Sequence, residues 1–85
     1  MAEQLVGTVT HYFGKPHVAI IEITDGEVHV GDTIRVVGHT SDFALKVESM
    51  QIEHASVESA GVGNSVGIEM AERAREGDRV YLVLD

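Results

Sequence analysis

The sequence predicts an all-β domain: a six-stranded closed antiparallel β-barrel with at most one short helical turn. Apolar side chains recur at every second residue through most of the 85 residues, which is the period of a half-buried strand. Gly, Asp and Asn residues that favour turns separate these runs at short intervals. Closure into a barrel removes the edge strands that would otherwise invite aggregation. A chain of this length fits a single domain over residues 1–85.

The first two expected strands form a hairpin. Residues 5–12 alternate between apolar and other side chains. Residues 17–24 are β-branched on both faces, as in a strand that is covered on both sides or closed into a barrel. The connecting segment 13–16, Phe-Gly-Lys-Pro, holds a Gly and a Pro, which favour a turn. A second turn is predicted at 24–27, where Asp is followed by Gly.

Two Gly-Asp pairs each precede an alternating apolar run. Gly31-Asp32 comes before the strand expected from Ile34, and Gly77-Asp78 comes before the one expected from Val80. Gly adopts backbone conformations closed to other residues, and an Asp side chain bonds to nearby backbone N–H groups. Each pair is therefore expected to end a turn and direct the chain into a strand.

The segment 42–54 changes the face on which its apolar residues lie. The apolar residues up to Val47 share one face of a strand, whereas Met50 and Ile52 fall on the other in strict alternation. A bulge near Glu48-Ser49 would bring both sets to the same interior.

The last third of the chain combines a strand with the one segment that resembles a helix. Residues 60–70 are rich in Gly and then alternate, which indicates a strand with a tight bend. Residues 70–77 are predicted to form a short helix, with possible Glu72–Arg75 and Arg73–Glu76 pairs.

The net charge of −8 restricts the partners that the chain can bind. Fourteen acidic residues stand against six basic ones. A protein that binds nucleic acid through its phosphates neutralises on the order of 6–10 of them. We therefore expect no DNA binding and at most weak RNA binding, and a protein partner is favoured.

Composition also limits the chemistry and the compartment. The chain has no cysteine, which excludes disulfides, thiolate zinc sites and thiol nucleophiles. No apolar run approaches the roughly 20 residues that span a bilayer, and the N-terminal residues lack the pattern of a secretory signal. A cytoplasmic protein without a membrane partner is expected.

Five stretches, taken together in order and spacing, resemble the second domain of translation GTPases such as elongation factor Tu. This resemblance covers residues 5–84 and implies a translation-protein β-barrel. The barrel at the C-terminus of some U32-type peptidases is similar too, and the sequence does not separate the two. The stretches are VGTVTHYF, GEVHVGDTIRVVG, VESMQIEH, AGVGNSVGIEM and AREGDRVYLVL.

The resemblance does not extend to the nucleotide-binding machinery. The pattern GxxxxGK[ST], which cradles phosphates, is absent, so no nucleotide and no GTPase activity are expected. In the translation family the barrel helps to hold the 3′ end of aminoacyl-tRNA, and an Asn in a Gly-x-Asn-Val-Gly run belongs to that surface. Here Ser65 stands in the place of that Asn and Asn64 lies one residue earlier. Asn64 and Ser65 are therefore candidate binding residues on a surface that departs from the family's.

Two further groups of residues are candidates for binding. Tyr12 and Phe13, with Lys15 at the tip of the first hairpin, would form a stacking platform for a base, or would instead pack the end of the barrel. Arg73 and Arg75 belong to the segment 72–79, which holds three of the six cations. These would contact RNA or an acidic partner, or would pair with the carboxylates of their own loop.

No catalytic residue, metal or cofactor is predicted. His11 and His17 flank the first hairpin, with Glu22 or Asp25 nearby, but no HExxH motif supports a metal site. The pattern GxSxG of a nucleophile elbow is absent, and an acidic pair such as Glu69 with Glu72 is expected by chance in so acidic a chain.

The sequence thus favours a non-catalytic module that binds a translation- or ribosome-associated protein. Two alternatives stay open. One is a barrel that binds tRNA or rRNA weakly, and the other is a trans-acting accessory domain of a U32-type peptidase.

Overall fold

The computed structural model describes residues 2–84, and every element of regular structure within them is a strand. All strand pairs are antiparallel, so the predicted all-β class is confirmed. The strands are β1 (Ala2–Phe13), β2 (Val18–Ile23), β3 (Glu27–His29), β4 (Thr33–Val37), β5 (Asp42–Lys46), β6 (Met50–Ile52), β7 (Ala55–Val57), β8 (Ser59–Gly61), β9 (Ser65–Glu69) and β10 (Arg79–Leu84).

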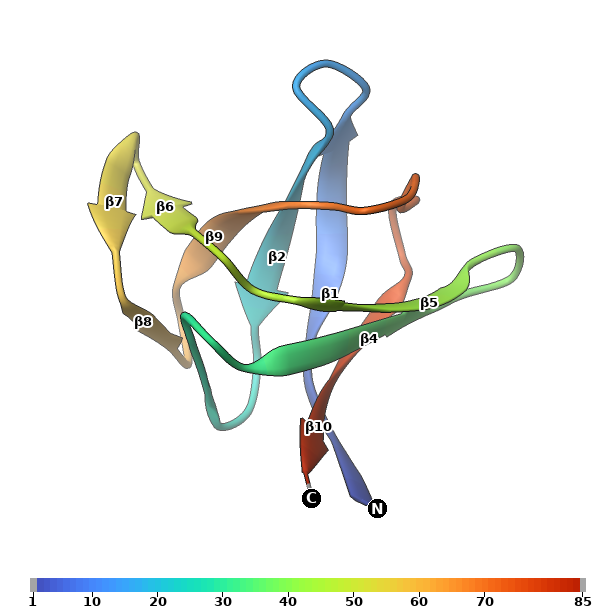
Figure 1. Cartoon of the computed structure of the whole chain (residues 1–85), viewed down its shortest axis with the longest axis horizontal. Helices are drawn as coiled ribbons and strands as arrows, with labels where there is room; N and C mark the ends of the chain where they lie inside the picture. Colours follow the sequence, from blue (N-terminus) through green and yellow to red (C-terminus); the bar gives the residue numbers. More distant parts are fainter. Residues whose placement is uncertain (1, 85) are drawn as a thin grey trace.

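The strands form one large bent sheet and one small one. Eight strands pair in the order β5-β4-β10-β1-β2-β9-β6-β7, and β3 pairs with β8. β4 and β5 run across the direction of β1 and β2, so the large sheet curves strongly around its buried side (Figure 1). That side carries a single apolar core, which includes Val6, Ile21, Ile34, Val66 and Val80.

The predicted closed barrel of six strands is not found. β5 and β7 end the order of the large sheet, so its hydrogen-bonded pairing does not run all the way round. The physical reason lies at β6, which pairs with β9 only at Met50–Ile68 and Gln51–Gly67. The preceding strand, β5, pairs with β4 and not with β9. The sheet is therefore open between β5 and the end of β9.

The change of face in segment 42–54 is confirmed, although it is a break rather than a bulge. β5 ends at Lys46, the next three residues have no regular structure, and β6 begins at Met50. Val47 and Met50, three residues apart, are both buried in the core. The break therefore lets apolar residues on both sides of it reach the same interior.

Three turns share one design. Each contains a Gly with positive φ followed by Asp or Asn, whose side-chain oxygen accepts a hydrogen bond from the backbone N–H three residues earlier. Two of them are the predicted Gly-Asp corners, and the third, at Gly63-Asn64, was not predicted. The bonds join His29 N to Asp32 Oδ2 (2.8 Å), Gly61 N to Asn64 Oδ1 (2.9 Å) and Arg75 N to Asp78 Oδ2 (2.9 Å), and the glycine φ angles are 99°, 92° and 91°.

The prediction of a helix over 70–77 is wrong. The segment is an irregular loop held down at three points. Met70 N donates to the carbonyl of His17, Gly77 N donates to the carbonyl of Val9, and the side chain of Ala74 is buried in the core. These tertiary contacts outweigh the weak helical preference of the charged residues in the segment.

Candidate functional site

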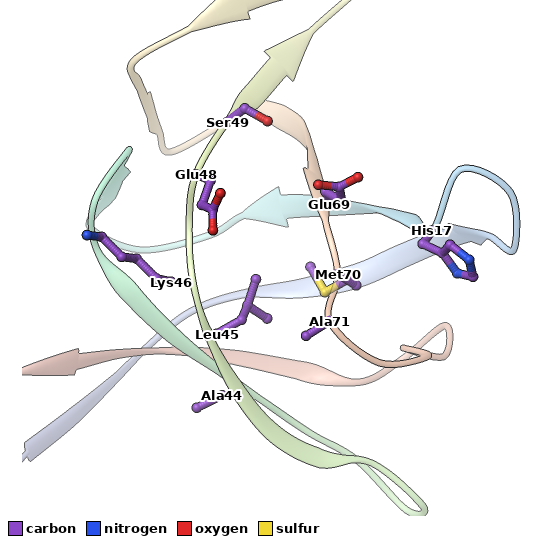
Figure 2. A pocket seen from close by; sticks show the side chains of 9 residues that line it. All are labelled: His17, Ala44, Leu45, Lys46, Glu48, Ser49, Glu69, Met70 and Ala71. Atoms are coloured by element: carbon purple, nitrogen blue, oxygen red, sulfur yellow. The ribbon is translucent and has the colours of Figure 1, made fainter.

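A groove lies where the large sheet is open. One wall is formed by residues 44–46 of β5 with Glu48 and Ser49, and the other by residues 69–71 at and after the end of β9, with His17 at one end (Figure 2). Its volume is about 380 Å³. Pockets that bind small ligands are roughly 300–1,000 Å³, so the groove is large enough to hold a ligand or a short peptide segment.

The groove has an apolar floor and a charged rim. Leu45 and Met70 lie between the two walls, and both belong to or pack against the core (Figure 2). Glu48 and Glu69 lie on opposite walls, whereas Lys46 points away from the centre of the groove (Figure 2). Two carboxylates against one ammonium group make this surface attractive to cationic groups.

A second cluster adjoins the groove at the first hairpin. The hydroxyl of Tyr12 lies 3.2 Å from Nδ1 of His17, and the guanidinium carbon of Arg73 lies 6.0 Å from the centre of the Tyr12 ring. That distance is at the outer limit of a cation–π contact. Arg75 lines a neighbouring hollow together with Tyr12 and Arg73. The structure therefore brings three of the predicted candidates together, with Lys15 exposed in the same hairpin.

Phe13 does not join Tyr12 in a stacking platform. Consecutive residues of a strand point to opposite faces of the sheet. Tyr12 packs against the core, whereas Phe13 is 45% exposed and its ring centre lies 4.5 Å from that of His11. The two aromatic rings thus serve different surfaces.

Phe13 instead borders a second groove on the outer face of the sheet. This groove has a volume of about 420 Å³, and Val18, Ile20 and Gly67 lie among the residues that line it. The candidate Ser65 belongs to the same lining. Asn64 has a structural role in the neighbouring turn, where its side chain accepts the hydrogen bond from Gly61. The seven predicted residues are therefore distributed over separate surfaces.

The strongest ion-pair network lies elsewhere, on exposed side chains of β1, β4 and β5. The guanidinium of Arg35 donates to Asp42 at 2.9 and 3.0 Å and to Glu3 at 3.1 and 3.3 Å. The hydrogen bonds with Asp42, and then those with Glu3, raise the pKa of Arg35 above its usual value. The hydrogen bonds from Arg35 lower the pKa of Asp42. One of the six cations of the chain is therefore already paired with carboxylates of the same chain.

The two histidines considered as a metal pair have separate contacts. His11 Nδ1 lies 3.3 Å from a carboxylate oxygen of Glu76, whereas His17 contacts Tyr12. Within residues 2–84, no group of three or more His, Asp or Glu residues could hold a metal ion. The same residues contain no helix long and apolar enough to cross a membrane.

Known proteins similar in sequence are much longer proteases. The chain is 42% identical over 79 residues to an uncharacterized protease of Methanocaldococcus jannaschii, a match that covers 92% of this chain and 19% of that protein. It is 38% identical over 77 residues to a collagenase of Porphyromonas gingivalis, covering 89% of this chain and 21% of that protein. The chain thus spans about a fifth of the length of these curated relatives. No protein-family model matches the sequence.

Solved structures settle the fold. Two crystal structures of the C-terminal domain of a Geobacillus thermoleovorans protein named as a U32 peptidase superpose with TM-scores of 0.87 and 0.84. They cover 95% and 91% of this chain, at 14% and 15% identity. The chain has the fold of a U32 peptidase C-terminal domain.

These comparisons correct the resemblance to translation GTPases. The relatives are named as a protease and a collagenase, and the similar structures come from a U32 peptidase. The landmarks behind the translation-factor assignment, such as the Val-Gly-Asp turn, form corners of the fold. A corner of this kind is dictated by backbone geometry, so it does not distinguish one family with similar turns from another.

Proposed function

We propose that this chain is a non-catalytic accessory module of a U32-type peptidase, which binds the catalytic part of the enzyme. The observation that carries the proposal is the 42% identity over 92% of this chain to a segment that makes up only 19% of a protease. The proposal is supported by the size of the segment and by its fold, which is that of a C-terminal domain whose crystal structure was solved on its own.

The distribution of chemical groups supports a binding role. Asp32 and Asp78, two of the carboxylates, are used to hold turns, and Asp42 pairs with Arg35. The open groove, by contrast, presents Glu48 and Glu69 beside an apolar floor. A surface that combines apolar area with a charged rim is typical of a protein-binding site.

The proposal is tested with the Porphyromonas gingivalis collagenase. The segment that aligns with this chain is deleted, and this chain is then supplied either as a replacement within the collagenase or as a separate protein. We expect the deletion to lower collagen cleavage and this chain to restore it, with direct binding of the separate chain measured by calorimetry. Failure of both forms to bind or to restore activity, with each protein folded by circular dichroism, would refute the proposal.

RNA binding is the second candidate function, favoured by the proximity of Tyr12, Arg73 and Arg75. A single-stranded RNA oligonucleotide would then bind at low salt, and its affinity would fall as salt is added. Arg73→Glu with Arg75→Glu would abolish that binding. The matched control is Arg35→Gln, which changes a cation already paired with Asp42 and Glu3.

A further inference from the structure

We propose that the open side of the large sheet binds an extended, basic peptide segment of a partner protein by β-strand addition between β5 and residues 69–71. The inference deepens the proposed function by naming the surface and the chemistry of the partner segment. Only the assumption that this partner is a peptidase rests on the proposed function.

The backbone of β5 has a free hydrogen-bonding edge. At its two ends, Gly38 N donates to the carbonyl of Ser41 (2.7 Å) and Val47 N donates to the carbonyl of Asp32 (2.8 Å). Alternate residues of an antiparallel strand turn their N–H and C=O groups to the same side. Residues 41, 43, 45 and 47 therefore face β4. Ala44 and Lys46 turn their backbone groups towards the groove, where the pairing within residues 2–84 gives them no partner.

The opposite wall offers backbone groups of its own. Ile23 N donates to the carbonyl of Asn64, and Met70 N donates to the carbonyl of His17, so even-numbered residues of β9 face β2. Glu69, by the same alternation, turns its backbone groups away from β2. Towards β6, the ladder of β9 ends at Ile68. The groove is thus bordered on one side by the unpaired edge of β5 and on the other by the backbone groups of Glu69, the last residue of β9.

A single inserted strand would fill this gap. β6 and β9 are antiparallel where they pair, and the chain segments 44–49 and 69–71 separate from one another beyond Met50–Ile68. A strand placed between them would be antiparallel to one wall and parallel to the other, and both orientations form ladders. Strand addition of this kind takes its affinity from the main chain and its specificity from alternate side chains.

The negative charge around the groove favours a basic peptide as the added strand. Glu48 and Glu69 flank the groove from opposite walls, and the chain as a whole carries −8 (Figure 2). Acidic peptides would be repelled, whereas Lys or Arg at alternate positions would face these carboxylates. The same charge disfavours a second copy of this chain, which would bring β5 and its acidic neighbours against themselves.

The experiment uses a fluorescent peptide of about eight residues that alternates Val with Lys, a length within the normal range of a strand. We expect the peptide to bind the full chain and to slow hydrogen exchange at the amides of Ala44, Lys46 and Glu69. N-methylation of alternate peptide residues removes the N–H groups of one edge and should abolish binding without any change to the protein. A peptide that alternates Val with Glu should not bind.

Protein variants test the charges separately. Glu48→Gln with Glu69→Gln should weaken binding of the Lys peptide about three- to tenfold, because an exposed ion pair contributes little to binding. Glu53→Gln with Glu58→Gln is the matched control, since neither residue lines this groove, and it should leave affinity unchanged.

Three results would overturn the inference: no peptide binding at low salt, equal binding of the N-methylated peptide, or protection of β5 that depends on protein concentration and reports a second copy. Peptide binding without rescue of the collagenase would leave this inference standing and refute the proposed function. Rescue of the collagenase without peptide binding would refute this inference and leave the proposed function standing.

Discussion

The carboxylate of Asp78 lies directly against the α-carbon of Gly38, so that the turn before β10 is locked onto the end of β4. A methyl group at position 38 would overlap Oδ1 of Asp78. Asp78 is only 4% exposed, and its other carboxylate oxygen accepts the hydrogen bond from Arg75 N. Position 38 therefore needs a Gly for space, whatever its backbone angles.

Gly38→Ala is expected to destabilise the domain by about 1–3 kcal/mol, the usual cost of forcing an extra methyl group into a packed site. Urea unfolding of the purified chain gives the free energy. Gly14→Ala is the matched control, because a methyl group there would meet no atom within 4 Å, and its effect should stay within about 0.5 kcal/mol. Equal effects of the two changes would show that Asp78 does not restrict position 38.

The hydrogen bond within the turn makes a second prediction. Asp78→Ala removes the acceptor for Arg75 N and should cost about 1–3 kcal/mol, since a partly buried donor is left unpaired. Asp78→Asn keeps a carbonyl oxygen, as Asn64 does in the corresponding turn, and should retain most of the stability. Urea unfolding of both variants distinguishes the two cases, and equal losses would mean that the negative charge rather than the hydrogen bond matters.

The two residues of the turn between β6 and β7 are not the most stabilising ones for its backbone conformation. Glu53 and His54 both have positive φ, 51° and 66°, and Ile52 pairs with Ala55 across the turn. Such turns favour Gly, and a non-Gly residue in this conformation costs roughly 1 kcal/mol.

His54→Gly should therefore raise the free energy of unfolding by about 0.5–1 kcal/mol, measured by thermal or urea unfolding. The comparison variant is Ala55→Gly, in the adjacent strand, which should lower it by a similar amount because Gly weakens a strand interior. A loss of stability in His54→Gly would indicate that the imidazole makes a contact that outweighs the backbone preference.

Local patterns in the sequence predicted local structure well. Alternation over 5–12 and 17–24 indicated the first hairpin, and the Gly-Asp pairs indicated two corners, because both features depend on neighbouring residues alone. The change of face between Val47 and Met50 was also readable, since both side chains are apolar and must be buried.

The open side of the sheet could not be predicted in the same way. It depends on how far the pairing of β6 with β9 continues beyond Met50–Ile68. These two residues are distant in sequence, and no local pattern encodes the length of such a pairing. The segment 70–77 was assigned to a helix because its charges have helical spacing, while Ala74 gave no sign that it is buried.

The residues of the candidate site were also predicted only as far as local sequence patterns reach. Tyr12 and Phe13 were grouped as neighbours in sequence, although the alternation of a strand sends them to opposite faces. The groove residues, such as Leu45 and Glu48, were missed as a site. The signal that points to them is the change of face at Glu48-Ser49, which predicted only that apolar residues on both sides of it are buried together.

The ion pair of Arg35 with Asp42 predicts a dependence of stability on pH. Because the pKa of Asp42 is lowered in the folded state, the pair contributes stability above the unfolded pKa of about 3.9, and the contribution is lost as pH falls through the folded pKa. Arg35→Gln should return the pKa of Asp42 towards its usual value, as followed by NMR titration of the carboxyl carbon. Arg75→Gln is the control and should leave that titration unchanged, and a normal pKa in the unmodified protein would contradict the prediction.

Met50 makes the break in segment 42–54 testable. Its side chain is 1% exposed and reaches the core that also holds Val47, although the two residues would face opposite sides of a regular strand. Met50→Ala should cost about 2–5 kcal/mol, a large share of the 5–15 kcal/mol that stabilise a typical domain. Gln51→Ala, one residue along on the exposed face, should change stability by less than about 0.5 kcal/mol. The reverse order of effects in urea unfolding would mean that residues 50–52 are shifted by one position, which would also place Glu48 and the groove wall on the other face of the sheet.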